Sequence, residues 1–282
     1  MIHQYPLINI LYFTPLWYNQ TKAMTLATKF ELKSEGIPLT CAIFTPEYTG
    51  PFPGLIICHG MPANPLSSPS NQKESHNELD YPTLAELCAS EGFACVIFNF
   101  RGTGESGGNF HPLGWVHDLE TILDWTIKNP LVDPNRVTVL GSSLGAAISI
   151  YVTAHHREIA GLIAFASPAM LQPRKEPAKA VEQFRKLGII RNPEFPSSLR
   201  LWNQEYSEIN PSDHIGNIAT RHLLILQGET DEVVSPHNAQ VLFDAAKEPK
   251  EITLLPGVSH RFRHEPLAIT TALEWLKRNF IT

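Results

Sequence analysis

The sequence lacks the features that mark several common classes of protein. Its 22 lysines and arginines are outnumbered by 28 aspartates and glutamates, for a net charge of −6. It therefore has no excess of basic residues with which to displace counterions from a nucleic acid. Neither the phosphate loop G-x-x-x-x-G-K nor the zinc motif H-E-x-x-H occurs, and the four cysteines have no metal-ligand spacing. We expect no nucleic-acid partner, no metal and no cofactor.

No apolar run is long enough to cross a membrane. The segment Leu7–Trp17 is apolar, but Pro6 and Pro15 interrupt it, and it is shorter than the ~20 residues that a spanning helix needs. It also lacks the charged leader and the small-residue cleavage site of a signal peptide. Cysteines placed in apolar runs favour free thiols and a reducing compartment. We expect a cytoplasmic protein, a monomer or homodimer without a membrane partner, in which residues 1–23 are a peripheral extension of one domain at 24–282.

Short apolar runs alternate with helical patterns along the chain. The runs are continuous, as in strands buried on both faces, and lie at Leu55–Cys58, Ala94–Phe98, Val137–Leu140, Leu162–Ala166 and Leu223–Leu226, with a weaker one at Thr253–Leu255. Apolar spacing predicts helices at Thr83–Ser90, Val116–Ile127, Leu144–Ala154, Ala239–Ala246 and Leu267–Phe280. This order predicts an α/β fold with a mainly parallel central sheet and helices on both faces.

Two segments depart from the alternation. Thr25–Leu32 and Leu39–Phe44 are strand-like with no helix between them, so we expect an antiparallel N-terminal hairpin at the sheet edge. Residues 170–217 hold five prolines and two amphipathic pieces, Ala178–Leu187 and Ser198–Tyr206. We interpret this stretch as a small helical cap inserted between two strands.

A candidate nucleophile stands between a predicted strand and a predicted helix. Residues 141–145 read Gly-Ser-Ser-Leu-Gly and match the pattern G-x-S-x-G, which carries a nucleophile on a strand-to-helix turn. Glycines two positions before and after the serine remove side chains that would collide with the neighbouring strand and helix. Ser142 would place Leu140 and Leu144 at those positions, so Ser143 is the candidate.

The candidate nucleophile needs a base within hydrogen-bond reach, and the base needs an acid that orients it. In such a fold the acid follows a later strand, and the histidine lies in the loop before the last helix. Asp231 is our candidate for the acid, with Glu229 and Glu232 as alternatives on the same turn. His260 is our candidate for the base, and His264 is the nearest alternative.

An oxyanion hole requires two backbone donors. We expect one to be the N–H of Leu144, directly after the nucleophile, and the other to be the N–H of Met61, in the loop after the run that ends at Cys58. His59 lies in the same loop, so we expect it at the substrate pocket, with its side chain in a structural role rather than as a base.

The cap contributes aromatic side chains that are candidates for the wall of an apolar pocket. An equal alternative is that they pack the cap onto the body. These residues are Phe184, Phe195, Trp202 and Tyr206.

One further motif is set aside. Residues 102–107 read Gly-Thr-Gly-Glu-Ser-Gly and match the dinucleotide pattern G-x-G-x-x-G, but a dinucleotide site also needs a helix that opens at the third glycine. Gly108, Asn109 and Pro112 follow instead, so we expect no nucleotide.

Together these stretches resemble the α/β-hydrolase superfamily over roughly Thr25 to Phe280. Residues 101–108 look like the R-G-x-G-x-S-x-G loop of small esterases and dienelactone-hydrolase-like members, and residues 231–236 are similar to feruloyl and cinnamoyl esterases. Serine aminopeptidases and acyl-peptidases share many of these features. The resemblance implies acyl transfer to water through a serine ester, with Ser143, Asp231 and His260 as the triad and Met61 and Leu144 as oxyanion donors.

We therefore expect a serine hydrolase that cleaves a small or medium carboxylic ester. Two alternatives stay open: a serine peptidase of the same fold, acting on a short acyl or peptide substrate, and a non-catalytic binding protein on a hydrolase scaffold. Because fold alone does not fix a substrate, only assays on esters and amides separate them.

Overall fold

Eight strands form one sheet in the computed structural model, which describes residues 25–62 and 81–281. In chain order the strands are β1 (Thr25–Ser34), β2 (Ile37–Pro46), β3 (Phe52–Cys58), β4 (Ala94–Phe98), β5 (Val132–Ser142), β6 (Ile159–Phe165), β7 (His222–Gly228) and β8 (Lys250–Leu255). Their order across the sheet is β1-β2-β4-β3-β5-β6-β7-β8. β2 runs antiparallel to β1 and β4, and the strands from β4 to β8 pair in parallel. The predicted parallel sheet with an antiparallel N-terminal hairpin is confirmed.

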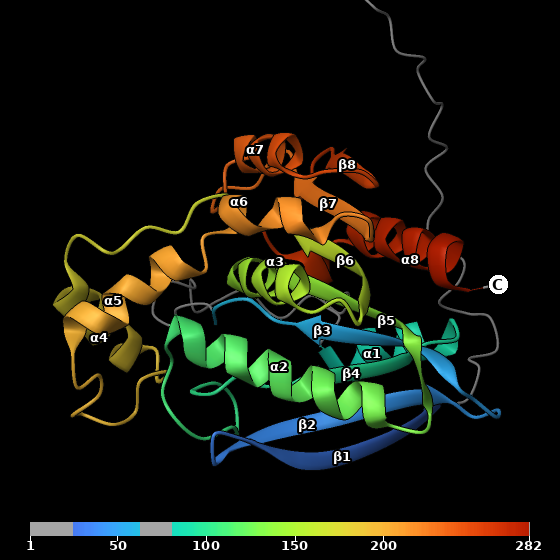
Figure 1. The fold of residues 1–282 in the computed structure, drawn as a ribbon, viewed down its shortest axis with the longest axis horizontal. Helices are drawn as coiled ribbons and strands as arrows, with labels where there is room; N and C mark the ends of the chain where they lie inside the picture. The colour runs from blue at the N-terminus through green and yellow to red at the C-terminus, as the bar shows by residue number, and fades with distance from the viewer. Residues whose placement is uncertain (1–24, 63–80, 282) are drawn as a thin grey trace, which may run out of the picture.

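The helices lie on both faces of this sheet (Figure 1). Helices α2 (Pro112–Lys128), α3 (Leu144–His155) and α7 (His237–Ala245) contribute to one buried apolar cluster, and α1 (Tyr81–Ser90) and α8 (Pro266–Phe280) contribute to the other. Adjacent strand residues divide between the two clusters, because successive side chains of a strand point to opposite faces. Ile56, for example, belongs to the α2–α3 side and Ile57 to the α1–α8 side.

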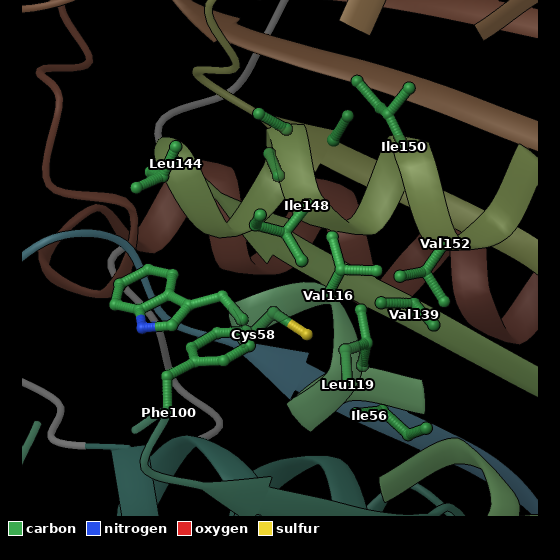
Figure 2. Close-up of a cluster of buried hydrophobic side chains, with 14 of the residues drawn as sticks. Ile56, Cys58, Phe100, Val116, Leu119, Val139, Leu144, Ile148, Ile150 and Val152 are labelled. Atoms are coloured by element: carbon green, nitrogen blue, oxygen red, sulfur yellow. The ribbon is translucent and has the colours of Figure 1, made fainter. Parts of the chain in front are cut away.

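The α2–α3 side holds the larger core. Figure 2 shows Val116 and Leu119 of α2 and Ile148 of α3 in one cluster with Ile56 and Val139 of the sheet. These side chains are at most 3% exposed, which explains why the strand runs of the sequence are apolar without interruption. The core therefore fixes the direction of β5 and α3 on either side of Ser143.

The segment between β6 and β7 carries the predicted helical insertion, which we define as residues 166–221. It contains α4 (Pro177–Lys186), α5 (Leu199–Glu208), α6 (Pro211–His214) and the short helix η2 (Ile215–Ile218). Helices α4 and α5 lie together at one side of the molecule, on the left in Figure 1, whereas α6 and η2 run back beside α3. A further short helix, η3 (Phe262–His264), precedes α8.

Some sequence-based interpretations lie outside the described residues. These are the peripheral extension at residues 1–23 and its apolar stretch Leu7–Trp17. Within the described ranges, the four cysteines are buried and unpaired, and burial raises the pKa of the Cys58 thiol to about 12. No helix in these ranges combines the length and the apolar character needed to cross a bilayer.

Candidate active site

Ser143 occupies a sharp turn between the end of β5 and the start of α3. Its backbone has φ +55° and ψ −125°, a conformation that non-glycine residues rarely adopt and that neighbouring structure must stabilise. The glycines around it are required by close contacts. A Cβ at Gly141 would lie 2.6 Å from Ala146 Cα, and a Cβ at Gly145 would lie 2.3 Å from the carbonyl oxygen of His59. The strand-to-helix turn predicted from the motif is therefore present.

Three side chains from distant parts of the chain form one hydrogen-bonded row. His260 Nε2 lies 3.0 Å from Ser143 Oγ, and His260 Nδ1 lies 2.9 Å from Asp231 Oδ2. Of the alternatives weighed from the sequence, Glu229 and Glu232 take no part in this row, and His264 lies on η3 at the edge of the cleft. The structure brings together the three residues that chain order selected.

The carboxylate of Asp231 is held by donors on both oxygens. Its Oδ1 accepts from the backbone N–H groups of Val233 and Val234 at 2.9 and 2.8 Å. Its Oδ2 accepts from Gln227 Nε2 at 2.9 Å in addition to His260. The Asp231 side chain is fully buried, so these donors replace the water that an ionised carboxylate would otherwise need. They also leave Oδ2 facing the imidazole.

The loop that carries His260 is fixed from two directions. Ser259 donates from its backbone N–H and its hydroxyl to Glu265 Oε1, at 3.0 and 2.6 Å. The Thr230 hydroxyl donates to the Val258 carbonyl at 2.8 Å, which ties the histidine loop to the turn that bears the acid. The distance between acid and base is thus set by the backbone.

A cleft of about 720 Å³ opens beside Ser143 and His260. Polar groups from the loops after β3, β4, β7 and β8 and apolar side chains surround it, and His59 and Met61 are among them as expected. The lining residues are His59, Gly60, Met61, Pro62, Tyr81, Asn99, Thr103, Gly104, Ser142, Ser143, Glu232, Val233, His260, Arg261, Phe262, Arg263 and His264.

The four cap aromatics are absent from this cleft, which corrects the expectation that they line the substrate pocket. Trp202 and Tyr206 are 2% and 1% exposed, and Phe184 is 8% exposed. Trp202 Nε1 donates to the Phe110 carbonyl at 3.3 Å, and the Phe184 ring packs edge-on against the Phe110 ring at 5.1 Å. These side chains, and Phe195 beside the same core, pack the insertion onto the body, because their large apolar area is buried there.

The two candidate oxyanion donors flank Ser143. Leu144 is the first residue of α3, and Met61 lies in the loop after β3 at the cleft. Gly60 brings this loop against the nucleophile, because a Cβ there would lie 2.9 Å from Ser143 Cβ. Within the described residues, no acceptor is bonded to the N–H of either Leu144 or Met61. Neither amide is therefore occupied by another described residue.

Sequence reasoning missed the side chains that order the loop of residues 99–108 at the cleft. The buried Arg101 guanidinium forms an ion pair with buried Asp118 at 2.8 Å. From the insertion, Arg191 donates to the carbonyls of Gly102, Gly104 and Ser106 at 3.2, 2.8 and 2.7 Å. A single sequence contains no pattern that pairs residues so far apart. The arginine of the R-G-x-G-x-S-x-G stretch was the one available signal.

The strand order and the serine elbow define the α/β-hydrolase class. The sequence profile of the prolyl oligopeptidase family matches residues 80–281, so the chain belongs to this family and has the α/β-hydrolase fold. Within the described ranges, no three side chains among His, Cys, Asp and Glu are grouped as metal ligands.

Known proteins resemble the chain at moderate to low identity. An uncharacterized protein from Mycobacterium tuberculosis (strain H37Rv) is 27% identical over 216 residues, covering 75% of this chain and 64% of that protein. The match thus spans less than two thirds of the relative's length. The solved α/β hydrolase GrgF from Penicillium sp. sh18 has a TM-score of 0.67 at 19% identity, covering 91% of this chain and 100% of GrgF. Est1E from Butyrivibrio proteoclasticus, solved with ferulic acid, has a TM-score of 0.62 at 21% identity, covering 88% of this chain and 96% of Est1E. These two structures support the fold.

Proposed function

We propose that the protein is a serine hydrolase that cleaves a small or medium carboxylic ester through an acyl-enzyme on Ser143. The observation that carries this proposal is the continuous row Ser143–His260–Asp231, with contacts of 3.0 and 2.9 Å. A serine hydroxyl is a weak nucleophile without a base, and the base needs a fixed tautomer. Asp231 accepts a hydrogen bond from the Nδ1–H of His260, so the proton stays on Nδ1 and Nε2 keeps the lone pair that faces Ser143.

Each step of the reaction has a residue in place. Ser143 Oγ attacks the ester carbonyl carbon while His260 Nε2 takes the hydroxyl proton. The tetrahedral intermediate collapses, the C–O bond to the alcohol breaks, and His260 gives its proton to the departing alkoxide. Water then attacks the acyl-enzyme with His260 again as base, which releases the carboxylic acid and restores Ser143.

Two backbone amides support the charge that develops on the carbonyl oxygen. The N–H of Leu144 directly follows Ser143, the N–H of Met61 belongs to the loop that contacts it, and neither is bonded to another described residue. Donors placed in advance stabilise the transition state more than the ground state, and losing one costs about 10²- to 10³-fold in kcat. Both the start of α3 and the loop after β3 would thus contribute a donor to the oxyanion hole.

The size of the cleft favours a small or medium substrate. Its volume of about 720 Å³ lies in the range of ~300–1,000 Å³ that is usual for small-molecule sites. Phe262 and the exposed Val233 give it apolar surface, and Asn99 gives it a polar group. An acyl group of modest size fits this mixture.

Hydrolysis of a short peptide is the second candidate. Membership of the prolyl oligopeptidase family favours it, and the same triad serves an amide by protonating a leaving amine instead of an alkoxide. The choice between them requires turnover of matched esters and amides.

The test is turnover of p-nitrophenyl acetate and butyrate beside aminoacyl-naphthylamides. We expect Ser143→Ala to lose about 10⁶-fold in kcat, the scale for a triad serine, whereas Ser207→Ala, on the exposed side of α5, keeps the wild-type rate. Faster amide turnover would favour the peptidase. If a fluorophosphonate fails to label Ser143 in the wild-type protein, the catalytic assignment is wrong and a binding protein takes its place.

A further inference from the structure

The His59 side chain is held between two loops by hydrogen bonds on both ring nitrogens. Its Nδ1 lies 2.7 Å from the Gly60 carbonyl oxygen, and the Phe100 backbone N–H donates to its Nε2 at 3.2 Å. The Thr103 hydroxyl also lies 3.2 Å from Nε2 and donates to the Phe100 carbonyl at 2.7 Å. Because an amide N–H can only donate, Nε2 is the acceptor, and the ring proton is on Nδ1, where it donates to Gly60. The rings of Phe100 and Trp115 pack edge-on against the imidazole, with centroids 5.2 and 5.5 Å away. His59 therefore has one orientation and one tautomer.

The charge state of His59 agrees with this tautomer. Burial lowers its pKa more than the bond to the Gly60 carbonyl raises it, so the ring is neutral at neutral pH. A protonated ring would carry an N–H on both nitrogens, and its Nε2 proton would oppose the Phe100 N–H. The hydrogen bonds and the ionisation thus require the same form of the ring.

The bond from His59 reaches the peptide unit that bears one candidate oxyanion donor. The Gly60 carbonyl and the Met61 N–H belong to one trans peptide, which is planar, so the two groups point in opposite directions. Fixing the oxygen therefore fixes the N–H. A hydrogen bond to the carbonyl also polarises the peptide and strengthens its N–H as a donor.

The same peptide lies against the nucleophile. The Cβ that Gly60 lacks would come within 2.9 Å of Ser143 Cβ and 3.0 Å of the Ser142 carbonyl oxygen. The Gly60 backbone also interacts with the Tyr81 hydroxyl, whose pKa burial raises to about 12. Gly60 thus interacts with two side chains while it touches Ser143.

We propose that His59 is a positioning residue for the oxyanion hole, holding the Gly60–Met61 peptide so that the Met61 N–H faces the oxygen of the tetrahedral intermediate. It is not a second base, because its Nε2 accepts from Phe100 and Ser143 is bonded to His260. This inference rests on the proposed serine-hydrolase function.

Two substitutions at His59 separate positioning from packing. In His59→Asn the side-chain amide N–H occupies the place of Nδ1 and still donates to Gly60, whereas His59→Phe keeps the ring and loses the donor. We expect His59→Phe to lower kcat by about 10-fold or more with KM little changed, since the donor that it misplaces is worth about 10²- to 10³-fold. We expect His59→Asn to recover most of that loss. Equal losses in both variants would overturn the proposal.

A double-mutant cycle with Met61→Pro tests whether His59 acts through this N–H. Met61→Pro deletes the donor, and Met61→Leu keeps it as the control. If His59 acts through Met61, then His59→Phe in the Met61→Pro background lowers kcat by less than about 2-fold, because interacting sites are non-additive. Losses that multiply would show an independent, structural role for His59 and overturn the proposal.

Misfolding of His59→Phe and inactivity of the wild-type protein are distinguishable from failure of the proposed role of His59. If His59→Phe does not fold, His59→Gln replaces it, because its amide reaches the Nε2 position and leaves the Gly60 oxygen without a donor. If the wild-type protein turns over no ester or amide and no fluorophosphonate labels Ser143, the proposed function fails. An active wild-type enzyme with a multiplicative cycle rejects the role of His59 alone.

Discussion

Gly145 packs so closely against His59 that no side chain fits between them: a Cβ on Gly145 would lie 2.3 Å from the carbonyl oxygen of His59. The turn that bears Ser143 therefore contacts the loop after β3. The same Cβ would also lie 2.7 Å from the Cys58 carbonyl oxygen. Both of these atoms are backbone, so neither moves without displacing the end of β3. The close approach of α3 to this loop brings together the two segments that carry the Leu144 and Met61 amides.

Substituting Gly145 therefore separates these two loops. We expect Gly145→Ala to destabilise the protein by about 1–3 kcal/mol, the usual cost of overpacking, and to lower kcat more than it raises KM. Urea unfolding and turnover of p-nitrophenyl butyrate measure the two effects. Gly216→Ala is the matched control with a smaller expected loss, because its Cβ would meet the Ala245 carbonyl oxygen at 3.1 Å, a close contact that a shift of a few tenths of an ångström relieves. A Gly145→Ala variant with wild-type stability and kcat would contradict this account of the elbow.

The hydrogen bonds of Asp231 predict the orientation of the side-chain amide in Asp231→Asn. In Asp231→Asn the side-chain oxygen stays at Oδ1, where two backbone N–H groups donate, so the NH₂ takes the place of Oδ2. Gln227 Oε1 is buried without a partner among the described residues, and a rotation of its amide would let it accept from that NH₂. The NH₂ then donates to His260 Nδ1 and forces the ring proton onto Nε2, which removes the base.

We expect Asp231→Asn to lose about 10⁴-fold in kcat, the scale known for a triad acid replaced by its amide, with the fold intact. Turnover of p-nitrophenyl butyrate and the thermal unfolding midpoint are the two measurements. Asp213→Asn is the control, because Asp213 is exposed on α6 and accepts from Asn210 Nδ2 at 2.8 Å. An Asp231→Asn variant within 10-fold of wild type would show that the acid does not set the tautomer.

Much of the fold and the three candidate catalytic side chains could be predicted from local patterns. Continuous apolar runs identified the parallel strands, because a strand buried on both faces has no polar alternation. Ser143 followed from glycine spacing, and Asp231 and His260 followed from chain order in a fold that places strand ends at one edge. Helix and strand bounds moved by a few residues only, as with β5, which begins at Val132 rather than near Val137.

Contacts between the insertion and the body could not be predicted in this way. An aromatic residue such as Trp202 or Phe184 looks the same in the sequence whether it lines a cleft or packs against Phe110. The position of α4 and α5 on the body decides between these two roles. The pairing of Arg191 with three loop carbonyls depends on the same placement. Gln227 belongs to a buried strand, and no local pattern relates it to Asp231.

The ion pair of Arg101 and Asp118 gives a sharp prediction for stability. Asp118 on α2 is fully buried and accepts from Arg101 Nε at 2.9 Å and Nη2 at 2.8 Å, and also from the Arg101 backbone N–H at 2.7 Å. Removing one partner of a buried pair costs about 3–5 kcal/mol. Arg101 keeps a second ion-pair partner, the half-exposed Glu35 at 2.9 Å, so we expect Asp118→Asn to lose about 3 kcal/mol, the lower end of that range, in urea unfolding.

The same helix supplies the control. Asp124 pairs with Lys128, and their side chains are 60% and 70% exposed. We expect Asp124→Asn to change the free energy of unfolding by less than about 1 kcal/mol, since exposed pairs are screened by water and salt. Equal effects of the two substitutions would show that the Arg101 pair does not anchor the loop at residues 99–108.

The charges around the cleft predict a preference among esters. Among the described residues that line it, two carry a guanidinium, Arg261 and Arg263, and one, Glu232, carries a carboxylate, on a chain whose net charge is −6. Arg261 directly follows His260 and is exposed. Its guanidinium forms no ion pair within the described ranges, so it is available to an anionic group on a substrate near the scissile bond.

We expect a p-nitrophenyl monoester of a dicarboxylic acid to be turned over with a higher kcat/KM than p-nitrophenyl butyrate. Arg261→Gln should lower kcat/KM for the anionic ester by about 1.5- to 5-fold, the scale of one exposed ion pair, and leave the neutral ester unchanged. Added salt should reduce the difference, because it screens exposed charges. Arg200→Gln is the matched control, since Arg200 is exposed on α5 and bonded to Gln204. An equal loss for both esters would mean that Arg261 positions the His260 loop instead of binding the anion.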